Sequence, residues 1–377
     1  MKQIMHLTSA HTRFDTRIFH KMCRSITNYN YSVNLVVADG KGDEIWGGVS
    51  IVDSGAPSGR FNRIRNAPGR VLAKAVEVDA DLYHLHDPEL IPIGVKLKKL
   101  GKRVIFDSHE DVPRQMLGKP YLNQSMRWGI AQAFRFYEAW ACKQFDGVIA
   151  ATPFIRDKFL AINPKSIDIN NFPLLDELAS VTSWTQKQPA VCYVGGIGKI
   201  RGIVKVTQAM DLVQSAARLQ LAGRFSETDL EHRVQALSGW QRVDALGFVD
   251  RGGVRDVLAR SMAGLVTFLP APNHIDAQPN KMFEYMSAGI PVIASDFPLW
   301  REIVAGNDCG LLVDPLNPAQ IAEAIDYLVT HPDDAERMGR NGRRAVLEQF
   351  NWPTEEKKLL GFYERVMKSN TWSPSYQ

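Results

Sequence analysis

Three side chains in the stretch DAQPNKMFEYMSAGIPVIAS, residues 276–295, are of types that bind a polar ligand. Asp276 and Glu284 carry carboxylates, which accept hydrogen bonds from hydroxyl groups. Lys281 carries a cation near the start of a predicted helix, where free backbone amides also attract phosphate. A ligand with phosphate beside hydroxyls would use both kinds of group. The alternative is a surface ion pair, because Lys281 and Glu284 stand three positions apart on one helix and could pair for about 0.2–0.5 kcal/mol.

The elements predicted around this stretch would bring it to one edge of a sheet. Residues 263–268 are predicted as a strand and residues 269–278 as a loop. Pro279 suits the first turn of a helix, Gly289 suits its C-terminal end, and a strand at 291–295 follows. In such a unit the loop and the helix start lie at the carboxyl edge of the sheet, where open α/β folds bind ligands. We therefore expect a sugar nucleotide here, since it combines phosphate with hydroxyls.

Short apolar runs alternate with helix-like stretches along the whole chain, which is typical of parallel sheets buried on both faces. The predicted strands are 3–7, 33–38, 82–86, 104–107 and 148–151 in the first half, and 191–195, 219–222, 263–268, 291–295 and 311–313 in the second. We expect an α/β protein with two similar domains, residues 1–175 and 190–352, joined by a polar linker at 176–189. A C-terminal helix at 353–369 is expected to complete the first domain.

The composition is that of an ordinary globular protein with more than one core. The 377 residues are 45% hydrophobic and 23% charged, and the four cysteines form no CxxC pair. We therefore expect a reduced, cytoplasmic protein without a disulfide framework. No segment stays apolar over the roughly 18 residues of a membrane span, and the first residues do not resemble a signal peptide. The expected protein is soluble or peripheral to a membrane.

The formal net charge of +4 is unevenly distributed along the chain. Residues 1–170 contain 24 Lys and Arg against 17 Asp and Glu, a net +7, whereas residues 171–377 contain 21 against 24, a net −3. A total this small argues against nucleic acid as a partner. The basic first half suits an acidic substrate or an anionic membrane surface. Ordinary solvated surface charge explains the asymmetry equally well.

The pattern as a whole resembles the GT4-type retaining glycosyltransferases, whose GT-B fold consists of two Rossmann-like domains facing across a cleft. Their signature is a Glu-x7-Glu pair followed by an Ala-x-Gly-x-Pro-Val turn, and here Asp276-x7-Glu284 runs into MSAGIPVIAS. Further landmarks are LYHLHDPELIPIG, VIFDSHE, YVGGIGKIRGI, LGFVDRGGV and NDCGLLVDPLNP. The resemblance implies transfer of a sugar, with retention of its anomeric configuration, from a nucleoside-diphosphate sugar to a glycan or lipid-linked acceptor. The implied pathway is a bacterial surface polysaccharide (O-antigen, capsule or exopolysaccharide), with no metal and no cofactor.

The resemblance also implies roles for residues of the second domain. Glu284 would hold the ribose hydroxyls, Asp276 would hold hydroxyls of the donor sugar, and Arg201 would bind the diphosphate. The base would lie against the backbone of Phe248 and Val249. The other donor-binding residues expected on this basis are Gly195, Gly196, Gly198, Arg224, Asn280 and Lys281.

Two positions of the donor site depart from the family pattern. Relatives usually carry an arginine where this chain has Gly196, so phosphate binding lacks one charge. Lys281 could supply it, and Lys199 is a weaker substitute. Asp276 is one methylene shorter than the usual glutamate, so the donor sugar must sit closer, be bridged by water, or differ from the common ones.

In the first domain the resemblance points to residues that follow strands. His109, in FDSHED, is expected against the donor sugar and the acceptor, and it joins Asp276 and Glu284 as a catalytic candidate. The candidates for the acceptor side are Arg13, Asp15, Arg17, His86 and Glu110. Many relatives have a glycine-rich loop after the first strand, whereas this chain has SAHTRFDTRIF. A capped helix start, with Asp15 held by an arginine, therefore stays open as an alternative.

The segment 115–145 is rich in Trp, Phe and Tyr with basic residues between them. Such a segment could lie on an anionic membrane surface, and we expect contact with the cytoplasmic face of the inner membrane as one interpretation. A helix that packs into the first domain is the other.

Several rival interpretations concern metals, cofactors and activity. The pair Asp79 and Asp81 leads into a strand and His232, His274 and His331 lack ligand spacing, so no metal is predicted. The run GGIGKIRG departs from the spacing of a dinucleotide fingerprint, which leaves an oxidoreductase as a minor alternative. A sugar-nucleotide epimerase of the same architecture and a catalytically silent partner protein are the remaining alternatives.

Overall fold

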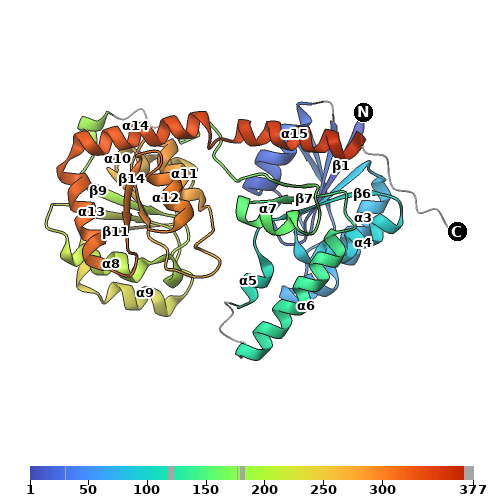
Figure 1. Ribbon diagram of the computed structural model, residues 1–377, viewed down its shortest axis with the longest axis horizontal. Coiled ribbons are helices and arrows are strands. Elements are labelled where there is room, and N and C mark those ends of the chain that lie inside the picture. The colour runs from blue at the N-terminus through green and yellow to red at the C-terminus, as the bar shows by residue number, and fades with distance from the viewer. Residues whose placement is uncertain (30, 118–122, 176, 179–182, 369–377) are drawn as a thin grey trace. The chain divides into compact units, whose positions relative to one another are not determined.

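The computed structural model describes residues 1–29, 31–117, 123–175, 177–178 and 183–368 (Figure 1). The chain divides into two compact units, one formed by Met1–Asn171 together with Pro353–Gln377 and the other by Phe172–Trp352. The first unit is therefore built from two separate parts of the sequence. Residue 369 of the predicted C-terminal helix, and residues 176 and 179–182 of the predicted linker, lie outside the described residues.

The first unit contains an eight-stranded sheet in the order β3-β4-β2-β1-β5-β6-β7-β8. Neighbouring strands are parallel except for β3 and β4, which pair antiparallel. The strands are β1 (Lys2–Leu7), β2 (Tyr31–Val37), β3 (Glu44–Trp46), β4 (Val49–Asp53), β5 (Leu82–Leu85), β6 (Arg103–Ser108), β7 (Gly147–Ala150) and β8 (Ser166–Asp168).

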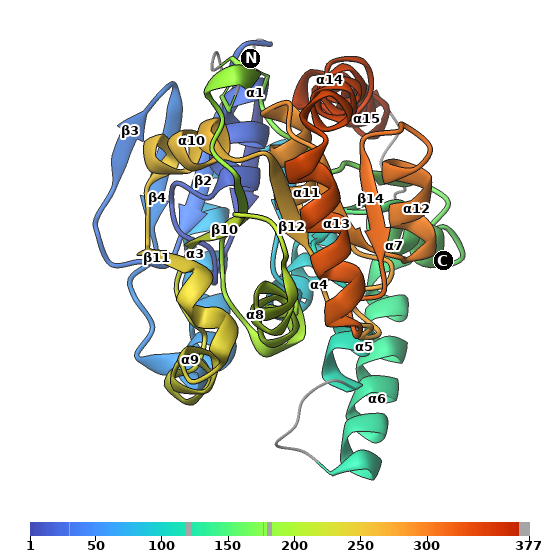
Figure 2. The ribbon, with the colours of Figure 1, turned by 90° about the vertical axis from the view of Figure 1, so that its left-hand side faces the viewer.

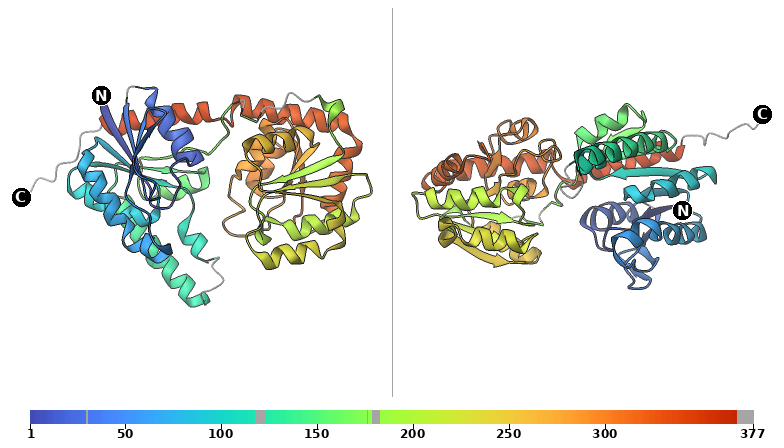
Figure 3. Two further views of the ribbon diagram at one scale, coloured as in Figure 1. Left: turned by 180° about the vertical axis from the view of Figure 1, so that it is seen from behind. Right: turned by 90° about the horizontal axis from the view of Figure 1, so that it is seen from below.

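Helices cover both faces of this sheet because alternate strand residues point to opposite sides (Figure 3). On β5, Tyr83 and Leu85 belong to the core shared with α3, α4 and α6, whereas His84 faces the other way and meets Tyr363 of α15. The helices are η1 (Thr16–Cys23), a π-helix, α1 (Arg24–Thr27), α2 (Gly59–Arg65), α3 (Ala67–Val78), η2 (Pro88–Leu90), α4 (Ile91–Lys99), α5 (Val112–Leu117), α6 (Gln124–Cys142), α7 (Pro153–Leu160) and α15 (Trp352–Lys368).

The second unit contains a six-stranded parallel sheet in the order β11-β10-β9-β12-β13-β14. The strands are β9 (Ala190–Val194), β10 (Arg218–Ala222), β11 (Val243–Gly247), β12 (Ala263–Val266), β13 (Val292–Ser295) and β14 (Gly310–Val313). The helices are η3 (Trp184–Gln186), η4 (Lys199–Arg201), α8 (Ile203–Leu212), α9 (Thr228–Gln235), η5 (Ser238–Arg242), α10 (Arg251–Arg260), α11 (Asn280–Ser287), α12 (Pro298–Val304), α13 (Pro318–Thr330) and α14 (Pro332–Glu348).

Residues of β9 show how this second sheet is packed. Cys192 and Val194 belong to the core formed with α10, α11 and α12, whereas Val191 and Tyr193 belong to the core formed with α8 and α13. Both faces are thus buried, as the continuous apolar strands predict.

Each strand expected from the apolar runs is present, and β3, β4, β8 and β11 are strands that we did not predict. β3, β8 and β11 are edge strands, where one side has no neighbouring strand, and β4 lies next to the edge. β11, for example, is exposed over three of its five residues. The parallel sheet expected for the first unit carries one additional antiparallel pair at its edge, because Gly47 and Gly48, both at positive φ, turn β3 back into β4.

The described part of the predicted linker packs on the second unit. Leu178 is fully buried in the core of that unit, and Glu177 pairs with Arg251 of α10. Lys187 donates from Nζ to the carbonyl oxygens of Leu258, Ala259 and Ser261 at 2.8–3.4 Å. The polar composition of this segment therefore reflects its position on the surface of the second unit, and its described residues are not a free linker.

Candidate functional site

Helix α11 begins where the sequence predicts and places Lys281 at the carboxyl edge of the second sheet. Pro279 precedes its first residue, and Gly289, at a φ of 73°, ends it in the left-handed region. Met282, Phe283 and Met286 are buried against the sheet and anchor the helix. Lys281 is buried as well, so its aliphatic stem is fixed and only its amino group remains to be satisfied.

The amino group of Lys281 has no hydrogen-bond partner among the residues that the structure describes. Its Nζ lies 3.5 Å from the centroid of the Tyr193 ring and 5.6 Å from that of Phe268, so its nearest neighbours are aromatic faces. Burial, and then the charge of Arg201, hold the pKa of Lys281 well below its usual range. A buried amine without a carboxylate beside it can donate hydrogen bonds to an anionic ligand.

The loop between β9 and α8 contains several glycines, and one of them lies next to this amine. Gly195 has a φ of 102°, and a Cβ added there would lie 3.8 Å from Cε of Lys281. The carbonyl of Gly196 accepts hydrogen bonds from Nη1 of Arg201 at 3.0 Å and from the hydroxyl of Tyr193 at 3.1 Å. Gly198 precedes the short helix η4 that carries Arg201.

Because Gly195 has no side chain, none stands at this point of the loop beside Lys281. Gly196, where relatives carry a charge, instead supports the guanidinium of Arg201 through its carbonyl. Lys199 is exposed on η4, and its side chain forms no hydrogen bond or ion pair among the residues that the structure describes.

Glu284 lies one turn after Lys281 but pairs with another residue. Nη1 of Arg251 donates to Oε1 of Glu284 at 2.7 Å, while Nε of Arg251 donates to Glu177 at 2.8 Å. The surface ion pair between Lys281 and Glu284, the alternative from the sequence, is not among the ion pairs of the described residues. Burial opposes the charge of Arg251, but Glu177 and Glu284 outweigh it and raise the pKa of Arg251.

The remaining donor-side candidates line the same edge of the sheet. Asp276 is half-buried in the turn before α11, where Nε1 of Trp300 donates to the carbonyl of Ala277 at 2.7 Å and holds the loop. Asn280, the first residue of α11, is exposed.

A flat exposed pair follows the neighbouring strands β10 and β11. The guanidinium of Arg224 lies 4.5 Å from the centroid of the Phe248 ring, and Phe248 is 67% exposed. Val249, next in the chain, packs against the core and fixes the position of Phe248. Such a surface is suited to stack against a planar ring.

In the first unit, two of the acceptor-side candidates are fully engaged by the protein itself. Arg13 is buried and donates to both oxygens of Asp39 at 2.6 and 2.7 Å and to Glu44 at 2.5 Å. Arg17 is buried and forms a two-pronged pair with Asp107 at 2.8 and 3.0 Å. These contacts pair both guanidinium groups with carboxylates of the first unit, and the substrate contact expected from the sequence stays a prediction.

Asp15 also serves the start of a helix, as the alternative interpretation has it. Its Oδ1 accepts from the amides of Arg17 and Ile18 at 2.8 and 2.9 Å and caps η1. Its other oxygen lies 3.4 Å from Nδ1 of His11, so a histidine and not an arginine holds it. Burial alone would raise the pKa of Asp15, but His11 and the Ile18 amide outweigh it and lower the pKa.

His109 follows β6 directly and remains partly exposed, with 19% of its side chain accessible. Its Nε2 lies 3.1 Å from Oδ2 of Asp107, which is fully buried. Burial would raise the pKa of Asp107, but the guanidinium of Arg17 outweighs it and holds this pKa well below its usual range. Glu110 is exposed and accepts a hydrogen bond from Gln115.

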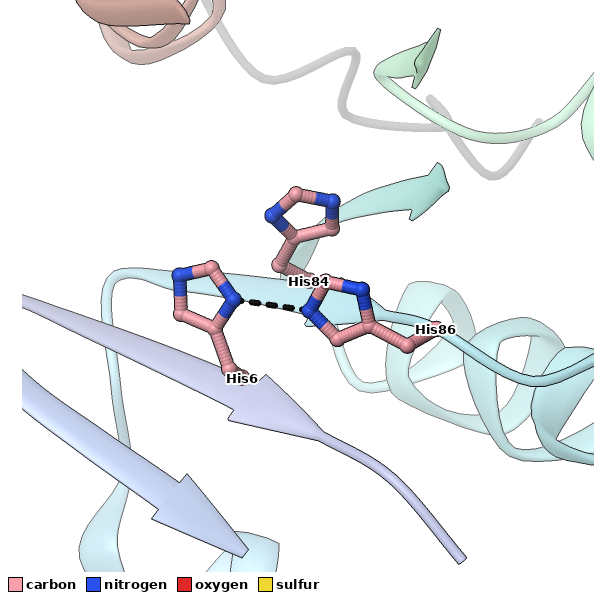
Figure 4. A group of neighbouring side chains, drawn as sticks. All are labelled: His6, His84 and His86. Atoms are coloured by element: carbon pink, nitrogen blue, oxygen red, sulfur yellow. Dashed lines mark hydrogen bonds between the residues drawn. The ribbon is translucent and has the colours of Figure 1, made fainter. Parts of the chain in front are cut away.

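Behind His109, three more histidines form a fully buried cluster (Figure 4). Nδ1 of His6 lies 2.8 Å from Nε2 of His86, and Nδ1 of His86 lies 3.3 Å from both Asp107 and His109. Burial first, and the neighbouring ring next, hold the pKa of His6 and of His84 well below the usual range, and burial lowers that of His86 to about 4. All three rings are therefore neutral at physiological pH.

The spacing of these histidines raises the question of a metal. The ligand atoms of His6, His84 and His86 lie within 4.8 Å of one another, as do those of His86, Asp107 and His109. The 2.8 Å between the ring nitrogens of His6 and His86 is a hydrogen-bond distance, whereas two nitrogens bound to one tetrahedral zinc lie about 3.3 Å apart. The set of His6, His84 and His86 therefore does not fit a bound cation, and in the set of His86, Asp107 and His109 the charge of the carboxylate is already balanced by Arg17.

The sequence analysis missed three residues that organise these sites. Asp107 and Arg251 were overlooked because each acts on another side chain, His109 or Glu284, and no motif spacing marks such a contact. His11 faces Asp15 and Asp87 at 3.4 Å and stands 4.9 Å, ring to ring, from His109. Its place in SAHTRFD, directly after the first strand, was an available signal.

Two family models match the chain, and together they span most of it. The model described as Glycosyltransferase Family 4 matches residues 8–169, and the model described as Glycosyl transferases group 1 matches residues 176–345. Among curated proteins, the phosphatidyl-myo-inositol mannosyltransferase of Mycobacterium leprae is 24% identical over 327 residues, 83% of this chain and 82% of that protein.

Solved structures show the same fold. The sucrose-phosphate synthase from Thermosynechococcus elongatus matches with a TM-score of 0.80 at 18% identity, over 98% of this chain and 100% of that one. The Anabaena protein HepE in complex with UDP-glucose matches with a TM-score of 0.73 at 14% identity, over 97% and 100%. Two units with parallel sheets, each covered by helices on both faces, are thus the arrangement known as the GT-B fold.

Proposed function

This chain belongs to the GT4-type glycosyltransferases, and from that premise we propose that it moves a sugar from a nucleoside-diphosphate sugar to a hydroxyl of a glycan or lipid-linked acceptor. We further propose that the anomeric configuration is retained and that the product enters a bacterial surface polysaccharide. The observation that carries the proposal is the buried, unpartnered amine of Lys281, which faces a glycine loop beside Arg201.

The diphosphate is the leaving group, so its developing charge is what the second unit must stabilise. Lys281 and Arg201 supply two cations, and the first turn of α11 supplies backbone amides. Because Lys281 is buried among aromatic rings, water screens its attraction for phosphate only weakly. These groups stabilise the diphosphate more strongly as the bond to the sugar breaks.

The rest of the donor is matched by groups along the same sheet edge. Glu284 has one oxygen held by Arg251, which leaves the other to accept ribose hydroxyls. The exposed ring of Phe248 with Arg224 above it offers a surface for the base. Asp276, on the loop before α11, is the residue proposed to accept hydroxyls of the sugar. The partly exposed ring of His109 is proposed as the group of the first unit that contacts the reacting sugars.

Donor binding is tested first, by thermal shift with a panel of UDP, GDP and other nucleotide sugars, because a specific ligand stabilises the fold by RT ln(1 + [L]/Kd). The sugar nucleotide that binds is then supplied in labelled form with glycan and lipid-linked acceptors. We expect label in the acceptor with its anomeric configuration unchanged. An epimerised donor, or a bound donor that no acceptor consumes, would contradict transfer.

Two variants tie this activity to the site. Glu284→Ala and Arg201→Ala should each lower kcat/KM at least about tenfold, equivalent to about 1.4 kcal/mol of transition-state stabilisation. Arg218→Ala, which breaks the exposed pair between Arg218 and Asp244 in the same unit, is the matched control. Wild-type rates in both site variants would remove the assignment of the donor site.

We also propose that helix α6 lies on an anionic membrane surface. α6 extends beyond the other elements of its unit (Figure 2), and Trp128, Phe136 and Trp140 are 63%, 70% and 55% exposed. Arg135 and Lys143 are exposed on the same segment and suit anionic head groups. No helix in the described part of the chain is long and apolar enough to cross a membrane, so contact with a bilayer would be confined to its surface.

Flotation with liposomes that contain anionic phospholipid tests this surface. The triple variant Trp128→Ser, Phe136→Ser, Trp140→Ser should lose most of the binding of the wild type, and the wild type should bind anionic but not neutral vesicles. Leu347→Ser, on an exposed position of α14 in the other unit, is the control. Equal binding of all three proteins, or none with the wild type, would rule out this role of α6.

A further inference from the structure

The buried histidines behind His109 form one continuous chain of hydrogen bonds that ends at Asp107. Nδ1 of His84 meets the hydroxyl of Tyr363 at 2.6 Å, and that hydroxyl meets Nε2 of His6 at 3.3 Å. Nδ1 of His6 meets Nε2 of His86 at 2.8 Å, and Nδ1 of His86 lies 3.3 Å from Oδ2 of Asp107. The members come from β1, from β5 and the residue directly after it, from β6 and from α15 of the first unit.

The negative charge of Asp107 favours one placement of hydrogens when this chain is followed outward from it. The carboxylate is ionised beside Arg17, so it only accepts, and Nδ1 of His86 must carry a hydrogen toward it. Nε2 of His86 then accepts from Nδ1–H of His6, and Nε2 of His6 accepts from the hydroxyl of Tyr363. The oxygen of Tyr363 accepts from Nδ1–H of His84.

This placement leaves a single lone pair without a partner, Nε2 of His84. The same atom is the one ring nitrogen of the buried cluster that has no hydrogen-bond partner among the described residues. It stands 3.9 Å from Oδ2 of Asp107, beyond hydrogen-bond distance. The direction of the whole chain is therefore set at its one charged end.

The same carboxylate decides where His109 carries its hydrogen. Nε2 of His109 lies 3.1 Å from Oδ2 of Asp107, and a lone pair there would face a negative charge. In the neutral ring the hydrogen therefore sits on Nε2, and Nδ1 keeps a lone pair. Nδ1 has no hydrogen-bond partner among the described residues, and the ring is partly exposed.

We propose that Asp107 is a positioning residue that holds His109 in the Nε2–H form, so that Nδ1 of His109 accepts a hydrogen bond from a hydroxyl of the reacting sugar or acceptor. Arg17 keeps the carboxylate charged and holds its orientation, and the chain from Tyr363 to His86 ends in a further hydrogen bond to the same carboxylate. The C-terminal helix α15 thereby supports the site through Tyr363. This inference rests on the proposed function, since it needs a sugar hydroxyl as the partner of Nδ1.

Two substitutions of His109 separate the roles of its nitrogens. An asparagine places its amide oxygen near the position of Nδ1, whereas a glutamine reaches the position of Nε2. We expect His109→Asn to keep a measurable part of the transfer rate and His109→Gln to lose at least about tenfold more. Equal rates in the two variants would overturn the assignment of Nδ1 as the acceptor.

The tautomer itself is read by 15N spectroscopy of histidine-labelled protein. We expect the wild type to show a protonated Nε2 and an unprotonated Nδ1 at His109, and Asp107→Asn to shift this balance and lower kcat at least about tenfold. Tyr363→Phe should lower kcat by a smaller factor. Tyr83→Phe, which removes another buried hydroxyl from the opposite face of β5, should leave both the spectrum and kcat unchanged. A wild-type spectrum with the hydrogen on Nδ1 would overturn the proposal, even if Asp107→Asn fails to fold.

The nucleotide-induced thermal shift distinguishes this failure from a failure of the proposed function. All five variants lie in the first unit, so each should bind the donor nucleotide with the affinity of the wild type. A wild type that binds no nucleotide sugar would refute the function, whereas normal binding and transfer with no response to Asp107 or His109 would refute the positioning role alone.

Discussion

At the scale of single residues, Lys281 shows how burial prepares a side chain for a ligand. An exposed lysine would be hydrated and would gain little from binding a phosphate, because water screens the attraction. Lys281 has lost its hydration to aromatic neighbours and has gained no carboxylate, so its charged form is disfavoured until an anion arrives. A diphosphate bound between Lys281 and the loop from β9 to α8 would stabilise the protonated form of Lys281.

This environment predicts that donor binding takes up a proton. Burial and Arg201 lower the pKa of Lys281 in the free protein, and a bound diphosphate would raise it again, so the affinity should fall as pH rises between these two pKa values. Titration calorimetry of UDP in buffers of different ionisation enthalpy measures the proton directly. Lys281→Met should abolish the proton uptake and weaken binding at least about tenfold. Proton uptake that persists in this variant would assign it to another group.

Arg251 is expected to affect nucleotide binding only through the contact between Glu284 and the ribose. Its pair with Glu284 holds one carboxylate oxygen, and this should orient the other toward the ribose hydroxyls. Because the pair is partly exposed, we expect Arg251→Ala to raise the Kd of UDP by no more than about fivefold, which is about 1 kcal/mol. The Kd of a 2′,3′-dideoxy analogue should not change. Tighter UDP binding in the variant would instead mean that Arg251 competes with the ribose for Glu284.

At the scale of elements, the loop between β9 and α8 brings Arg201 near α11 only because Gly202 lets two backbones touch. Gly202 has a φ of 84°, and a Cβ added there would lie 1.9 Å from the carbonyl oxygen of Thr267, after β12. No L-residue fits this position without moving the loop away from β12. The loop between β9 and α8 and the loop before α11 are therefore held together by backbone contact. The position of Arg201 depends on that contact.

Gly202→Ala should destabilise the second unit by about 1–3 kcal/mol and weaken UDP binding together with it. Chemical denaturation and calorimetry measure the two effects. Gly69→Ala is the matched control, since Gly69 lies in helix α3 with no atom within 4 Å of an added Cβ, and it should be neutral or stabilising. A Gly202→Ala protein with unchanged stability would show that the loop can shift freely.

At the scale of the whole molecule, the buried histidines make stability depend on pH. His6, His84 and His86 have pKa values below that of an unfolded histidine, about 6.5, so in mild acid the unfolded chain binds more protons than the native one. Stability should therefore fall as pH falls from about 6.5 toward 4, with a slope of up to about 1.4 kcal/mol per pH unit for each group. Above pH 7 these groups should contribute no slope.

Thermal unfolding of the first unit between pH 7 and pH 5 checks this expectation. His84→Gln retains hydrogen-bonding groups but cannot take up a proton, so it should flatten the dependence, whereas His331→Gln, at an exposed histidine, should not. An unfolding midpoint that stays constant from pH 7 to pH 5 in the wild type would show that the cluster is already protonated or open to water.

The central strands, most of the helices around them and the family could be predicted from the amino-acid sequence. Continuous apolar strands separated by helices have few arrangements that bury both faces of a sheet, so the two α/β units and the strands of their centres could be predicted, as could the start and end of α11 from Pro279 and Gly289. Edge strands such as β11 escaped because half-exposed strands carry a weak apolar signal.

The partners of the charged residues could not be predicted from the sequence and emerge from the folded structure. The spacing of Lys281 and Glu284 is that of an ion pair, yet Arg251, 33 positions away from Glu284, takes the carboxylate and leaves the lysine unpaired. Arg13 and Arg17 are expected from the sequence to face the substrate, yet their guanidinium groups form ion pairs with Asp39 and Asp107. The physical reason is that a charge is satisfied by whichever partner the fold brings within about 3 Å, and sequence spacing restricts that choice only within one helix or turn.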